Sequence, residues 1–172
     1  DLNIGKTHAS AGFFTAATFK NAFTFRVEAT FGKVSANDNV LAGVTDIAKE
    51  RFNRNTSFRS SITEFSAMAE IHPLFILINW PSYDEPPPRY SPYFLGGVGY
   101  YSFNPQSQSK DGRWVDLQPL RTEGQGFVAY PDRQVYKLKQ LNIPVGLGVK
   151  YELSSLVNLR GEFVYRMLNT DY

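Results

Sequence analysis

Residues 141–153 (LNIPVGLGVKYEL) alternate strictly between apolar and non-apolar positions. The odd-numbered residues are leucine, isoleucine, valine or tyrosine, and the even-numbered ones are polar, small, charged or proline. Because side chains alternate across a β-strand, one face of this segment is apolar and the other is polar. Strands of soluble proteins run about 5–6 residues, whereas a tilted membrane-spanning strand needs roughly 9–11. The length of the alternation therefore predicts a strand that crosses a bilayer, with its polar side turned into a barrel.

Other segments repeat the pattern. Residues 23–31 and 157–167 alternate as cleanly, and residues 65–71 do so more weakly. Residues 12–19 and 92–103 are β-rich in composition, but the phase of their alternation is ambiguous. Together these segments predict an all-β protein.

Hydrophobic periodicity and composition predict six long strands, at about 9–20, 22–35, 57–75, 90–104, 135–153 and 156–170. Tight turns are expected at Lys20-Asn21 and Ser154-Ser155, long polar loops at 36–56 and 105–134, and a proline-rich connection at 79–89. Alternate connections of antiparallel strands lie at opposite ends, so both long loops share one end. Outer-membrane barrels have this arrangement, with short periplasmic turns and longer extracellular loops.

Six strands would leave unpaired backbone groups in lipid, where each costs several kcal/mol. Single-chain bacterial barrels have even strand counts from eight upward. We therefore expect one strand before Asp1 and another after Tyr172. Residues 1–172 are interpreted as one all-β domain, an eight-stranded antiparallel transmembrane β-barrel whose first and last strands are incomplete or missing in this chain.

The composition of the chain excludes several kinds of site and partner. No run approaches 18 consecutive apolar residues, so the sequence predicts no transmembrane helix. The net charge of +2 is nearly balanced, which gives no electrostatic footprint for nucleic acid. The absence of cysteine excludes disulfides, thiolate metal sites and cysteine nucleophiles. No cofactor, metal ion or small-molecule substrate is expected.

The polar face of the predicted strands carries charges of both signs. If the apolar face looks outward, four basic and five acidic residues look inward: Arg26, Glu28, Glu64, Glu70, Lys150, Glu152, Arg160, Glu162 and Arg166. The interior of an eight-stranded barrel is just wide enough for side chains to fill, and an isolated buried ion is costly. The near balance of signs predicts a paired, plugged interior. An ion-conducting pore would instead show rings of one sign.

Catalytic residues are not expected. His72 has possible partners on its own strand in Glu70 and Ser66, but this spacing alone does not build a Ser-His-acid relay. The glycines at 96, 97 and 99 lack the lysine and the following helix of a phosphate-binding loop. They are interpreted, like Gly146 and Gly148, as marks of bends or tight packing inside the barrel.

The turn at residues 79–90 combines aromatic residues with a stiff polyproline segment. Two interpretations stand: an aromatic anchor at the membrane interface, and a contact surface for a periplasmic partner. The candidate contact residues are Trp80, Tyr83, Asp84, Glu85, Pro86, Pro87 and Pro88.

The second long loop contains WVDLQPLRTEGQG at residues 114–126, in which apolar and polar residues are interleaved. This stretch resembles the W-x-x-L-Q-P-L-x-T-E-G-Q-G motif of a family of small outer-membrane barrels from Bacteroidota, the PorG-like family. Further matching segments cover most of the chain in order: residues 1–3, 55–60, 92–93 with Gly97 and Gly99, 141–151 and 170–172. The loop motif is the specific part of the resemblance.

The resemblance implies an eight-stranded outer-membrane barrel without established catalytic residues. For its type IX secretion member it implies an anchor that holds the periplasmic ring of PorK-like and PorN-like subunits at the outer membrane. Three other readings stay open. They are a generic OmpA-like barrel that stabilises the envelope or adheres, an outer-membrane lipid hydrolase centred on His72, and a soluble lipocalin-type barrel with apolar residues inside.

Overall fold

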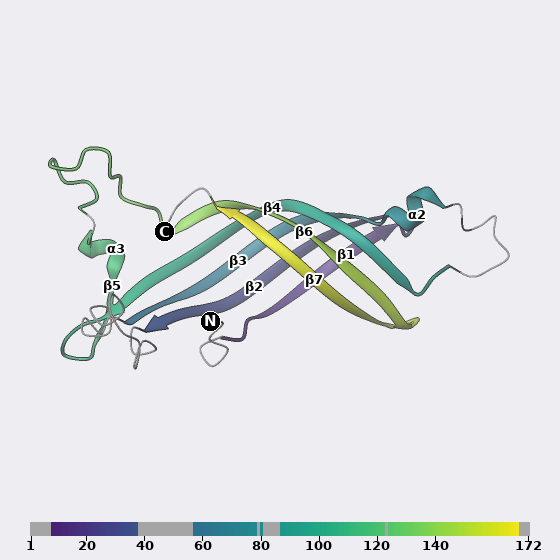
Figure 1. Ribbon diagram of the computed structural model, residues 1–172, viewed down its shortest axis with the longest axis horizontal. Helices are drawn as coiled ribbons and strands as arrows, with labels where there is room; N and C mark the ends of the chain where they lie inside the picture. Colours follow the sequence, from purple (N-terminus) through teal and green to yellow (C-terminus); the bar gives the residue numbers. More distant parts are fainter. Residues whose placement is uncertain (1–7, 38–56, 79, 81–86, 123, 169–172) are drawn as a thin grey trace, which may run out of the picture.

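The computed structural model describes residues 8–37, 57–78, 80, 87–122 and 124–168. These residues form an antiparallel sheet of seven strands with two short helices (Figure 1). In chain order the elements are β1 (Ala11–Phe19), β2 (Phe23–Asn37), β3 (Ser57–Ile71), α2 (Pro73–Leu77), β4 (Tyr90–Gln108), β5 (Trp114–Asp116), α3 (Leu117–Leu120), β6 (Lys139–Ser154) and β7 (Val157–Leu168).

The six long strands are hydrogen-bonded to one another in the order in which they occur in the chain, β1-β2-β3-β4-β6-β7, while short β5 pairs with the end of β4. Every pairing is antiparallel. The prediction of an all-β, antiparallel fold is therefore confirmed. Within the described residues, β1 and β7 are the two edges of the sheet and share no ladder.

The connections fall at two ends of the sheet, as predicted. At one end lie the β1–β2 turn, α2 and the β6–β7 turn, and at the other end lie the end of β2, the start of β3 and the connection that contains β5 and α3 (Figure 1). Most of the predicted long loop at 36–56 lies outside the described residues. Lys20 and Asn21 both have positive φ, 50° and 56°, as a type I′ turn requires. The second turn is at Ser155-Leu156, one residue later than predicted, because a register shift between Glu152 and Ser154 lengthens β6.

Two parts of the predicted layout were wrong. The third strand ends at Ile71 rather than near residue 75, because Pro73 begins α2. Proline has no N–H to give to a strand ladder, and its fixed φ suits the first turn of a helix. The second long loop also contains structure of its own, since β5 continues antiparallel to β4 and leads directly into α3.

The two faces of the sheet differ sharply in chemistry. Outward side chains such as Phe25, Leu147 and Phe163 are more than half exposed. On the opposite face Arg26 and Glu70 are buried. The outward and inward phases predicted for β2, β6 and β7 are therefore confirmed. A lipocalin-type barrel would show the reverse, with apolar residues inside.

The glycines of β4 permit close contact between neighbouring strands. A Cβ atom built on Gly97 would lie 2.1 Å from the Ala67 carbonyl oxygen and 2.8 Å from the Met68 Cα, both backbone atoms that cannot move aside. By contrast, a Cβ on Gly161 of β7 meets nothing within 4 Å. Gly97 is therefore required for the β3–β4 ladder to keep its spacing.

We expect Gly97→Ala to lower the free energy of unfolding by about 1–3 kcal/mol, because overpacking forces the backbone to shift. Gly161→Ala is the matched control and should change it little. Urea titration of the two variants measures the difference. Equal midpoints would contradict the close approach of β3 to β4.

Candidate functional site

Ion pairs join strands that are far apart in the sheet, across its inner face. The Arg26 guanidinium, 2% exposed, donates to both carboxylate oxygens of Glu162, at 2.6 and 3.0 Å. Arg26 lies on β2 and Glu162 on β7, with β3, β4 and β6 between them in the sheet. A bidentate pair between these strands requires the sheet to curl, which makes this face concave.

Further carboxylates surround the same arginine. Arg26 lies 3.4 Å from Glu28 on its own strand and 3.4 Å from Glu70 on β3. Arg160 of β7 donates to Glu70, and its Nε lies 3.7 Å from Glu162. We call these five residues the central charge network. It holds two arginines and three glutamates, so every charge has a partner of opposite sign.

Two aromatic rings support the arginines of the central charge network. The Cζ atoms of Arg26 and Arg160 lie 5.2 and 5.3 Å from the centre of the Phe14 ring. Arg160 also lies 5.0 Å from the Tyr93 ring, whose hydroxyl donates to Glu162 at 2.5 Å. Cations over aromatic faces gain electrostatic attraction, most of all when they are desolvated. The network is therefore fixed by packing as well as by charge.

A second, smaller group lies nearer the long-loop end. Arg166 Nε and Asn142 Nδ2 both donate to Glu64 Oε2, at 2.7 and 3.0 Å. These contacts connect β7, β6 and β3 over the concave face. The structure thus brings seven of the nine predicted interior charges into ion pairs: Arg26, Glu28, Glu64, Glu70, Arg160, Glu162 and Arg166.

Lys150 and Glu152 were predicted to belong to the same interior set. Their strand phase is as predicted, but neither makes an ion pair with a described residue. Both lie close to the β6–β7 turn, where Lys150 is partly exposed and Glu152 is exposed. Solvated charges at the end of a strand do not need a partner, so the network ends before it reaches them.

His72 has partners that its own strand did not reveal. Its Nδ1 is 2.7 Å from Ser91 Oγ, and its Nε2 is 3.5 Å from Glu70 Oε2 and 3.3 Å from Thr24 Oγ1. Serine, histidine and a carboxylate thus lie in a row, as a hydrolase would need. However, Ser91 is only 3% exposed and His72 only 1%. A substrate carbonyl cannot reach an enclosed hydroxyl, so the row is best explained as hydrogen bonding that satisfies buried groups.

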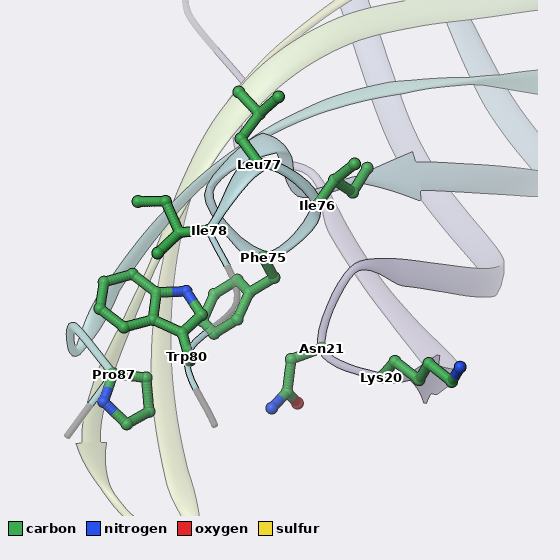
Figure 2. Close-up of a pocket in the computed structure, with 8 residues that line it drawn as sticks. All are labelled: Lys20, Asn21, Phe75, Ile76, Leu77, Ile78, Trp80 and Pro87. Atoms are coloured by element: carbon green, nitrogen blue, oxygen red, sulfur yellow. The ribbon is translucent and has the colours of Figure 1, made fainter. Parts of the chain in front are cut away.

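The α2 end of the sheet carries an apolar hollow of about 800 Å³. Figure 2 shows Trp80 beside Phe75 and Pro87, with Lys20 and Asn21 of the β1–β2 turn across from them. The Trp80 and Phe75 ring centres are 6.2 Å apart, and the indole N–H donates to the Leu74 carbonyl at 3.2 Å.

Three of the candidate contact residues lie in the described part of this turn. Trp80 and Pro87 line the hollow, and Pro88 lies two residues before the start of β4 at Tyr90. The others, Tyr83, Asp84, Glu85 and Pro86, lie outside the described residues.

The loop motif at residues 114–126 lies at the opposite end of the sheet (Figure 1). Asp116 accepts hydrogen bonds from Gln106 Nε2 at 2.7 Å and Asn104 Nδ2 at 3.0 Å, both on β4. These two bonds hold the pKa of the Asp116 carboxyl below its ordinary value, because they stabilise the charged form. Arg59 stacks over the Trp114 ring at 4.1 Å. The start of the motif is therefore attached to β3 and β4.

Comparison of the chain with protein-family models, curated proteins and solved structures finds no match. Among the described residues, no helix has the length and apolar character to cross a membrane. The same residues contain no group of three histidine or acidic side chains placed to hold a metal ion.

Proposed function

We propose that this protein is a non-enzymatic β-barrel of the bacterial outer membrane. The observation that supports this most is the division of the sheet into an apolar outer face and a charged inner face. The strands β2, β3, β4 and β6 have 15, 15, 19 and 16 residues, more than the roughly 9–11 that cross a bilayer. Lipid would cover the apolar side chains of the outer face, which water would otherwise have to solvate.

The proposed barrel has eight strands, with the exposed edges of β1 and β7 paired to further strands. Bare edges are not tolerated in lipid, since each unpaired backbone group costs several kcal/mol. The central charge network favours a plugged barrel over an ion path, because each of its charges lies beside a charge of opposite sign at the centre of the concave face.

For its biological role we propose a PorG-like component of the type IX secretion system, which anchors the periplasmic ring at the outer membrane. The support is the resemblance of residues 114–126 to the family motif, together with a plugged barrel suited to anchoring rather than transport. The short-turn end would face the periplasm, as in other outer-membrane barrels. Its α2 hollow and the 79–88 turn are the proposed contact with PorK-like or PorN-like subunits.

Two measurements test this proposal separately. The purified, unfolded chain is diluted into lipid vesicles, where we expect protease-protected strands and a heat-modifiable electrophoretic mobility. If the chain instead folds and stays in detergent-free buffer, the membrane location is refuted. In parallel, the tagged protein is purified from native envelopes. Ring subunits are expected with it, whereas a generic OmpA-like barrel would bring none.

A single substitution tests whether the α2 end contacts the ring subunits. We expect Trp80→Ala to reduce the ring subunits recovered with the protein by about tenfold, which corresponds to the loss of one aromatic contact at an interface. The control is Phe127→Ala, an exposed aromatic residue on the long-loop side. Both variants should keep the heat-modifiable mobility of the folded protein. Unchanged recovery with Trp80→Ala would remove the α2 end as the contact.

A further inference from the structure

A cavity of about 290 Å³ lies at the long-loop end of the concave face. Its walls include Ile62 of β3, Tyr101 and Phe103 of β4, and its loop side includes Leu117 of α3 and Tyr136. It is separate from the central charge network, none of whose residues line it. The loop motif thus contributes directly to a partly open, mostly apolar cavity.

The aromatic wall of this cavity is preformed. The Tyr101 and Phe103 rings stack with centres 5.6 Å apart, and the Phe103 and Tyr136 rings do so at 6.1 Å. The Phe103 N–H donates to the Leu138 carbonyl at 3.0 Å, which attaches the segment after Tyr136 to β4. Three rings in a row offer a flat apolar surface to a bound molecule.

The loop side is held in place by polar contacts. Leu117 follows directly after Asp116, whose carboxylate is bonded to Asn104 and Gln106. Gln118 Nε2 donates to the Tyr136 carbonyl at 3.5 Å, joining α3 to the far side of the loop. These bonds position Leu117 against the cavity without filling it.

One polar atom inside this wall has no hydrogen-bond partner among the described residues. Tyr101 is 6% exposed, and its hydroxyl is buried without a hydrogen bond to any described residue. A buried hydroxyl without a hydrogen bond is destabilising, because it has lost its bonds to water and gained none. A molecule in the cavity that supplied a donor or an acceptor would remove that cost.

The lining also defines the charge of such a molecule. Its other polar side chains are the hydroxyls of Ser60, Thr122 and Tyr136, and no described residue with a charged side chain lines it. A cavity of about 150 Å³ holds benzene, so 290 Å³ corresponds to roughly a bicyclic ring system. We propose that this cavity binds a small, neutral, mostly apolar molecule whose single hydroxyl or carbonyl group hydrogen-bonds to Tyr101 Oη. The proposal does not depend on the secretion role.

Equilibrium dialysis with 2-naphthol and naphthalene tests the proposal, since both probes fluoresce and differ by one hydroxyl. The folded protein is used in lipid nanodiscs, with empty nanodiscs as the blank. We expect Tyr101→Phe to weaken 2-naphthol binding about three- to tenfold, the usual value of one hydrogen bond, and to leave naphthalene binding unchanged. Tyr100→Phe is the control, because Tyr100 is the adjacent residue and points to the opposite face.

A second variant tests whether the two probes bind in this cavity. Leu117→Trp places extra volume in the cavity from the loop and should weaken both probes, without altering a barrel strand. Binding of neither probe above the blank overturns the proposal. So does binding that Leu117→Trp leaves unchanged, since the probes would then occupy another place. An equal response of the two probes to Tyr101→Phe overturns the assigned hydrogen bond.

Discussion

Replacement of Arg26 by methionine is expected to lower the free energy of unfolding by about 3–5 kcal/mol, the usual cost of removing one partner from a buried ion pair. Methionine keeps much of the length of the side chain but removes the charge. Glu162 then loses both of its short bonds from Arg26, and Glu28 and Glu70 lose a nearby cation. Urea titration of the protein folded in vesicles, followed by tryptophan fluorescence, measures the change.

Arg113→Met provides the control for this result. Arg113 is also paired with an acid, Asp111, but its side chain is 83% exposed. Exposed ion pairs contribute about 0–1 kcal/mol, so this variant should unfold almost like the parent. Adding Glu162→Gln to Arg26→Met should recover part of the lost stability, because it removes one of the excess negative charges that remain around Arg160. Similar losses for Arg26→Met and Arg113→Met would show that the central charge network is hydrated rather than enclosed.

Leu147→Arg is expected to destabilise the protein in a bilayer by about 2–4 kcal/mol, the cost of arginine on the lipid face near the midplane of a barrel. Leu147 lies in the middle of β6, between Phe94 of β4 and Phe163 of β7. In a water-soluble protein the same change on an exposed position would cost little. Unfolding in vesicles of defined thickness measures it.

Leu153→Arg is the matched control on the same strand. The two leucines are almost equally exposed, at 55% and 54%, but Leu153 is close to the β6–β7 turn. Near the interface the cost falls to about 0–1 kcal/mol. A strong effect at Leu147 with a weak one at Leu153 supports a lipid-covered belt. If both variants are neutral, the apolar face does not lie in lipid.

The strands could be predicted from the sequence because their signal is local. Alternation over ten or more residues fixes both the strand and its inward side, and the phases of β2, β6 and β7 needed no tertiary information. Paired interior charges could be anticipated from the balance of signs. Which residues pair could not, since Arg26 and Glu162 meet only through the curl of the whole sheet.

The alternation of apolar and polar residues in β4 is ambiguous in the sequence. The inward positions of Ser91 and Tyr93 therefore could not be predicted. The inward side was already marked by Gly97 and Gly99, which have the same parity as both residues and lie where strands approach closely. The inward position of Phe14 in β1 could not be predicted either. An apolar side chain is expected on the outer face, but the Phe14 ring lies on the inner face beneath the Arg26 guanidinium. The apolar run after Pro73 was read as strand, although proline at the first helical position is a known start signal.

The pairing of Arg26 with Glu162 has a consequence for how the chain acquires its structure. The two residues are 136 positions apart in sequence, and the Arg160–Glu70 pair spans 90. Contacts of such high sequence separation slow folding and form late, after the intervening strands are aligned. Until then the arginines and glutamates remain hydrated, and a partly assembled sheet gains nothing from them. The ion pairs therefore stabilise the protein only at a late stage of folding, once β7 has come across the concave face from β2.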